Sequence, residues 1–257
     1  MSDGSIEIKE AASAAREEAY SQPIESLNPA NSTLFETDTI WPYFERLRKE
    51  DPVHYAPAAD LEAHWAGDFG KAYIERNRVL DERRAAFWSG LLVEFEIRSA
   101  LEVGCGQGAN LSPISRVLKP PDVWGIDINE DALAIARVHA PGINVVAGSA
   151  RRLPFRDGLV DLAFTVGVLI HQPEATLPTV LGEIVRCSKR FVLWAEYHAP
   201  TTEEVPYRGL PGALFRRDYG RIYHELFPGL SVRREGFLAP EDGFDRVTWQ
   251  LLEKPPA

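Results

Sequence analysis

From about residue 98 onward, short apolar runs alternate with segments in which apolar residues recur at helical spacing. Short apolar runs are typical of buried strands, and a period of about 3.6 residues is typical of helices packed on a sheet. This alternation predicts an α/β fold with a doubly wound, Rossmann-like parallel sheet. The predicted strands are residues 100–103, 123–127, 144–147, 160–168, 190–195, 230–237 and 246–252, and the predicted helices between them are residues 110–118, 130–139 and 174–188.

The first predicted strand runs directly into a glycine-rich loop. The sequence LEVGCGQGAN places Glu102 in the strand and Gly104, Gly106 and Gly108 on alternate positions after it. Glycine permits backbone angles and close ligand approach that side chains forbid. The second predicted strand ends at Asp127, where a carboxylate can accept hydrogen bonds from both hydroxyls of a ribose. Together these features predict a nucleoside ligand.

The glycine spacing indicates which nucleoside is bound. The loop reads G-x-G-x-G rather than the dinucleotide fingerprint G-x-G-x-x-G, which argues against NAD. With its acidic residue before the loop and the carboxylate after the second strand, it resembles motif I of the class I S-adenosylmethionine-dependent methyltransferases. The resemblance implies S-adenosylmethionine as cofactor and a seven-stranded sheet with an antiparallel last strand. The cofactor-binding residues that it implies are Glu102, Gly104, Gly106, Gly108, Asp127, Ile128, Ser149, Ala150, Thr165 and Gly167.

Two of these implied contacts follow later strands. Many related enzymes carry an Asp that holds the adenine amino group at the position of Ser149, so that here Ser149 or Ala150 must make this contact. After the fourth strand, Thr165 and Gly167 are expected to line the cofactor, with His171 pointing toward the reaction zone. A lone histidine is often a packing residue, and both roles stay open for His171.

The chemistry of methyl transfer indicates what else the site needs. A sulfonium is already an activated methyl donor, so the protein must mainly align the acceptor and exclude water. A hydroxyl or amine acceptor also needs a base, and the candidates near strand ends are His171, Glu196 and His198. Tyr197, next to Glu196, is a further catalytic candidate expected to flank the sulfonium. Tyr207 and Arg208 lie on a long insertion and are candidate substrate-binding residues, since an arginine fork binds phosphate or carboxylate.

An aromatic segment precedes the glycine loop. In residues 64–77, Trp65, Phe69 and Tyr73 recur every four residues, which predicts a helix with one aromatic edge. This edge has two interpretations. It is either part of the core or a cover over the cofactor that keeps water from the sulfonium.

The chain from about residue 64 to its end resembles the methylases associated with pseudaminic acid biosynthesis. The residues that carry this resemblance are WAGDFGKAYIERN, the glycine loop, GVLIHQ, AEYHAP, VPYRG, LFRRDY and VTWQLLEK. It implies methyl transfer to a small-molecule acceptor such as a sugar or nucleotide sugar.

The first 60 residues have a different character. Residues 1–30 are rich in Ala, Glu and Ser, which predicts a segment that is flexible or forms at most a frayed helix. A short amphipathic helix is predicted around Trp41. Residues 28–57 resemble the N-terminal segment of bacterial haem-thiolate monooxygenases, but neither cysteine lies in a haem-ligand motif. We therefore expect a partly flexible N-terminal appendage, residues 1–60, and a methyltransferase domain, residues 61–257.

Composition and charge indicate which kinds of partner and location to expect. The formal net charge is -10 with no long basic tract, which argues against nucleic acid as substrate. No apolar run approaches the roughly 20 residues of a membrane span, and the acidic start MSDGSIEIKE does not resemble a signal peptide, so a cytoplasmic protein is expected. Two alternatives to a methyltransferase are a nicotinamide-dependent sugar enzyme, which lacks its motifs here, and a non-catalytic nucleoside-binding or scaffolding protein.

Overall fold

The structure is a computed structural model that describes residues 57–76, 82–208 and 212–256, together with positions 14, 17–21, 42 and 46. The chain divides into two compact units, Met1–Asp60 and Leu61–Ala257. The predictions for residues 1–30, for the helix around residue 41 and for the monooxygenase-like segment fall almost wholly outside the described residues. The described part has no helix long and apolar enough to cross a membrane.

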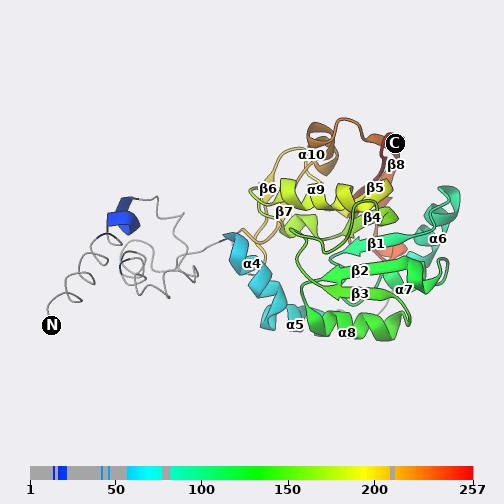
Figure 1. Ribbon diagram of the computed structural model, residues 1–257, viewed down its shortest axis with the longest axis horizontal. Helices are drawn as coiled ribbons and strands as arrows, with labels where there is room; N and C mark the ends of the chain where they lie inside the picture. Colours follow the sequence, from blue (N-terminus) through cyan, green and yellow to red (C-terminus); the bar gives the residue numbers. More distant parts are fainter. Residues whose placement is uncertain are drawn as a thin grey trace. The chain divides into compact units, whose positions relative to one another are not determined.

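The second unit is built on a seven-stranded sheet, which confirms the predicted fold class (Figure 1). Its strand order is β3-β2-β1-β4-β5-β9-β8. Only β9 runs antiparallel to its neighbours β5 and β8. The strands are β1 Ala100–Val103, β2 Val123–Asp127, β3 Asn144–Ala147, β4 Val160–Val166, β5 Ser188–Glu196, β8 Ser231–Leu238 and β9 Val247–Glu253, while β6 Glu203–Glu204 and β7 Phe215–Arg216 pair separately.

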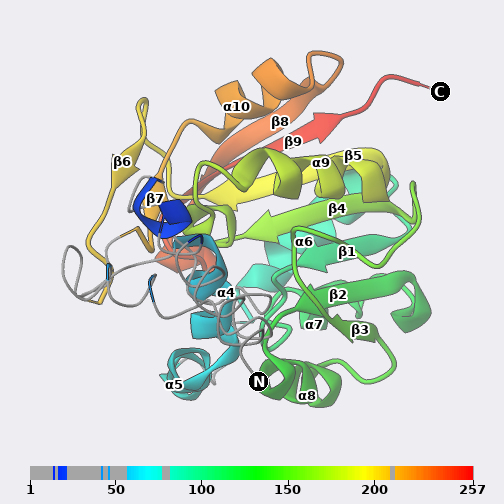
Figure 2. The same cartoon turned by 60° about the vertical axis from the view of Figure 1, so that its left-hand side comes forward.

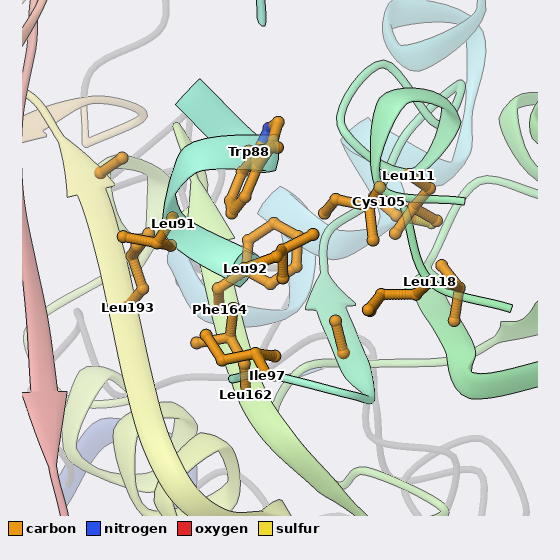
Figure 3. Close-up of a cluster of buried hydrophobic side chains, with 14 of the residues drawn as sticks. Trp88, Leu91, Leu92, Ile97, Cys105, Leu111, Leu118, Leu162, Phe164 and Leu193 are labelled. Carbon is orange, nitrogen blue, oxygen red and sulfur yellow. The ribbon is translucent and has the colours of Figure 1, made fainter. Parts of the chain in front are cut away.

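Helices cover both faces of this sheet. The described helices are α4 Pro57–Ala66, α5 Asp68–Arg76, α6 Arg84–Glu94, α7 Leu111–Ile114, α8 Glu130–His139, α9 Leu177–Cys187 and α10 Tyr219–Leu226, with short 3-10 turns η2 Pro120–Asp122, η3 Leu169–His171 and η4 Pro240–Asp242. One buried cluster joins α6 and α7 to the sheet through Trp88, Leu92 and Phe164 (Figure 3). A second cluster joins α9 and α10 to the opposite face, and Figure 2 shows α9 in front of β4 and β5.

Local chemistry shifts several predicted boundaries. The predicted helix of residues 64–77 is two helices that bend at Gly67. Strand β4 ends two residues early because Gly167 adopts a φ of 67°, which turns the chain out of the sheet. Helix α9 begins at Leu177 rather than residue 174, and its Pro178 lies in the first turn, where no intrahelical N–H is lost.

Candidate active site

A cavity of about 460 Å³ opens at the C-terminal ends of strands β1, β2, β3 and β4. Its walls come from the loops that follow these strands and from residues 61–76 of α4 and α5, which we call the cover segment. Open α/β sheets bind ligands at this edge, because the loops there are carried by a rigid scaffold. The position agrees with that expected for the glycine loop.

The three glycines of the loop have positive φ angles of 76°, 50° and 77° at Gly104, Gly106 and Gly108. A side chain at Gly104 would meet Val168 at 2.4 Å, and one at Gly108 would meet Ala136 of α8 at 3.2 Å. No atom lies within 4 Å of the position that a Cβ of Gly106 would take, and Gly106 lines the cavity. The loop is therefore closely packed at Gly104 and Gly108 and open to the cavity at Gly106.

Asp127 at the end of β2 is held by backbone amides. Its Oδ2 accepts a hydrogen bond from the Gly106 amide at 2.7 Å, and its Oδ1 accepts one from the Asn129 amide at 2.9 Å. Burial raises the pKa of Asp127, while these hydrogen bonds act in the opposite direction. The Ile128 amide also contributes a hydrogen bond to this carboxylate, which still has acceptor capacity because its two oxygens offer about four lone-pair positions. Asp127 and the next residue, Ile128, both line the cavity.

Glu102 forms the floor of the cavity and is 1% exposed. Its Oε1 accepts a 2.6 Å hydrogen bond from Asn110 Nδ2, whereas Oε2 has no partner among the described residues. Burial raises the pKa of Glu102 to about 8. Arg84 on α6 donates to Asn110 Oδ1 at 3.0 Å and also lines the cavity. The sequence interpretation gave no role to Arg84, which belongs to no recognised motif, or to Asn110, which ends the run LEVGCGQGAN after its glycines.

The cover segment is tied to the loops of the sheet edge. Asn129 Nδ2 donates to the carbonyl of Trp65 at 3.0 Å, and Gln107 Nε2 donates to the carbonyl of Ile74 at 2.9 Å. Trp65 and Tyr73 line the cavity, and their rings pack edge to face with centroids 5.3 Å apart. These rings line the cavity and lie outside the two buried clusters, with Tyr73 40% exposed, so the edge is not part of the core. That it covers the cofactor stays a prediction.

Ser149 and Ala150 line the end of the cavity that follows β3. The hydroxyl of Ser149 donates to Oε1 of Glu62 in the cover segment at 2.5 Å. Arg151 Nε lies 3.2 Å from the same oxygen. Glu62 also lines the cavity, although no sequence motif marks it.

His171 is the candidate base that lies at the cavity. Its ring sits between Trp65 and Tyr207, with centroid distances of 4.7 Å and 5.2 Å. Its Nδ1 lies 2.5 Å from the carbonyl oxygen of Ala213, so this nitrogen carries the proton and donates it, which leaves a lone pair on Nε2. Burial lowers the pKa of His171 to about 4, so the imidazole is neutral near pH 7.

Most of the remaining candidates do not line the cavity. Glu196 is fully buried and accepts hydrogen bonds from the amides of Val168 and Ile170, at 3.2 Å and 3.3 Å. It therefore holds the η3 turn that carries His171. The other candidates that do not line the cavity are Thr165, Tyr197, Tyr207 and Arg208, whereas Gly167 does line it.

Comparisons with known proteins agree with this geometry. Residues 100–190 match the family described as a methyltransferase domain. The chain has the class I methyltransferase fold. Magnesium protoporphyrin IX methyltransferase from Synechocystis, solved with bound SAM, superposes with a TM-score of 0.60 at 14% identity, over 79% of this chain and 99% of that one.

The curated relatives are matched by this chain over only part of their length. The chain is 31% identical over 203 residues to 24-methylenesterol C-methyltransferase 2 of Oryza sativa subsp. japonica, covering 73% of this chain and 51% of the relative. It is 33% identical over 96 residues to phthiotriol/phenolphthiotriol dimycocerosates methyltransferase 1 of Mycobacterium ulcerans, covering 37% and 35%. The chain thus spans about half or less of these relatives.

Proposed function

We propose that this chain transfers a methyl group from S-adenosylmethionine to a small-molecule acceptor. The observation that carries the proposal is the pair of carboxylates, Glu102 and Asp127, which line one cavity together with Gly106. S-adenosylmethionine has a ribose diol and an α-ammonium group. The diol matches the remaining acceptor capacity of Asp127, and the ammonium matches Oε2 of Glu102, which has no partner among the described residues. The residues present therefore fit this cofactor.

When bound, the cofactor would supply an activated methyl group on a sulfonium centre. The chain would contribute alignment and exclusion of water, through the glycine loop below and Trp65 and Tyr73 above. Nε2 of His171 would take the proton from the methyl acceptor, because Nδ1 already donates a hydrogen bond to the carbonyl oxygen of Ala213. Glu196 would act as a positioning residue for the turn that carries His171.

For the acceptor we propose a sugar or nucleotide sugar. The resemblance of residues 64–257 to methylases associated with pseudaminic acid biosynthesis supports this class. Aromatic rings around His171 also suit the apolar face of a sugar ring. The curated relatives are named for sterols and phthiotriols, so an apolar alcohol is the competing class. Incubation with labelled S-adenosylmethionine and either nucleotide sugars or sterols would distinguish the two.

Calorimetry with S-adenosylhomocysteine tests the cofactor site. Replacing Asp127 with Ala should weaken binding by about tenfold or more, because lost ribose hydrogen bonds cost on the order of 1–3 kcal/mol. Asp122 is exposed and directly precedes β2, whose last residue is Asp127. It provides the control Asp122→Ala, which should bind S-adenosylhomocysteine like the wild type. Equal affinity of wild type and Asp127→Ala would contradict the site. Tight binding without methyl transfer to any acceptor would favour a non-catalytic nucleoside-binding protein.

A further inference from the structure

Glu62 brings a carboxylate to the cavity from outside the sheet. It lies in the cover segment, and its side chain is 32% exposed. One of its oxygens, Oε1, accepts from the Ser149 hydroxyl at 2.5 Å and lies 3.2 Å from Arg151 Nε. Glu62 is thereby fixed against the loop after β3 by two side chains of that loop. Among the described residues, its hydrogen bond and its ion pair are with Ser149 and Arg151, neither of which belongs to the glycine loop or to the end of β2.

The position of Asp127 decides which part of a nucleoside reaches Glu62. Asp127 lies at the end of β2, between the glycine loop after β1 and the loop after β3 in the strand order. The β1 side contains Glu102, the acceptor for an ammonium group. With the ribose at Asp127 and the amino acid toward Glu102, the base must extend the other way, toward Ser149, Ala150 and Glu62.

The hydrogen-bonding groups at Ser149 and Glu62 favour a base that carries a hydrogen-bond donor. The Ser149 hydroxyl donates its proton in a hydrogen bond to Glu62, and its oxygen accepts a hydrogen bond from the Arg151 amide at 3.1 Å. The carboxylate of Glu62 has a second oxygen, and a carboxylate offers about four lone-pair positions for two oxygens. The exocyclic amino group of adenine is a hydrogen-bond donor. A keto group at the same position, as in hypoxanthine, is an acceptor and would face this carboxylate unfavourably.

We propose that Glu62 binds the adenine amino group of the cofactor, so that recognition of the base depends on the cover segment rather than on the sheet edge alone. This inference rests on the proposed S-adenosylmethionine site. It makes the cover segment a specificity element: only an amino-substituted base pairs with Glu62 when the segment is closed over the ligand. Arg151 keeps a positive charge beside Glu62 and so favours the ionised carboxylate as acceptor.

The test compares two ligands that differ at one group. The ligands are S-adenosylhomocysteine and S-inosylhomocysteine, in which oxygen replaces the adenine amino group, and binding is measured by calorimetry. The wild type should prefer the adenine ligand by at least about tenfold, because a site built for a donor rejects the analogue that lacks it. In Glu62→Gln the new amide can donate to the keto oxygen, so the preference should fall to within about threefold.

Two further variants control the comparison. Ser149→Ala removes a partner of Glu62 but keeps the carboxylate, so it should retain a preference for the adenine ligand. Glu225→Gln removes an exposed carboxylate on α10 and should behave as the wild type. An unchanged preference in Glu62→Gln, or an equal loss of both ligands, would overturn the inference. A wild type that binds neither ligand would instead refute the proposed function.

Discussion

At the scale of single residues, we expect Glu102 to couple ligand binding to the release of a proton. Its Oε2 has no partner among the described residues, and burial raises its pKa to about 8. The charged groups that face it are Arg84 and Asp127, and Asn110 provides a hydrogen bond. A ligand ammonium at Oε2 would favour the carboxylate form and lower this pKa. Below about pH 8, binding would therefore release a proton from Glu102.

The affinity for S-adenosylhomocysteine should consequently rise with pH from about 6 to about 8, by up to about tenfold per unit, and then level off. The slope should disappear in Glu102→Gln. Methylthioadenosine lacks the amino acid and keeps the ribose, so its affinity should show no such slope while sharing any contribution from Asp127. Calorimetry across this pH range measures both ligands. Identical pH slopes for the two would show that Glu102 does not bind the ammonium.

His171 supports a second prediction at this scale. Replacing it with Ala should leave S-adenosylhomocysteine affinity within about threefold but lower methyl transfer by about 10²–10⁴-fold, once an acceptor is known. Because burial lowers the pKa of His171 to about 4, the neutral base persists above this pH, and the wild-type rate should fall as pH drops through it. If His171→Ala turned over at the wild-type rate, His171 would not be the base, and catalysis would consist of aligning the acceptor with the methyl group.

At the scale of elements, the cover segment depends on one close approach. A Cβ at Gly70 would lie 1.8 Å from the carbonyl oxygen of Trp65 and 2.5 Å from Asn129 Nδ2. Both atoms belong to the hydrogen bond that ties the segment to the loop after β2. Helix α5 also lies beside α8, as Figures 1 and 2 both show.

Gly70→Ala should therefore displace the cover segment and weaken S-adenosylhomocysteine binding by about tenfold, mainly through faster dissociation. Gly90→Ala on α6 provides the matched control, because no atom lies within 4 Å of its added Cβ and alanine favours a helix. Stopped-flow dissociation rates would distinguish the two variants. If Gly70→Ala released the ligand no faster than Gly90→Ala, the segment would not enclose it.

At the scale of the whole molecule, local sequence patterns predicted most of the fold but only part of the site. Strands β1, β2 and β3 were predicted at their observed ends because each is a short apolar run with a loop signal after it. Glu62 and Arg84 reach the cavity from helices distant in sequence, and no local period marks them. Glu196 was predicted to face the reaction zone from its place at a strand end, whereas its hydrogen bonds turn it toward the backbone behind His171.

Strand β9 occupies an interior place in the sheet, with β5 on one side and β8 on the other. Phe191 of β5 pairs with Glu253 of β9. The strand that pairs with this edge of β5 is therefore synthesised long after β5 itself. At roughly 5–20 residues per second of synthesis, β5 exposes an unpaired apolar edge for several seconds. An exposed edge of this kind invites pairing with other chains. A ribosome that stalls before residue 247 would therefore release a chain prone to aggregation, however complete its glycine loop.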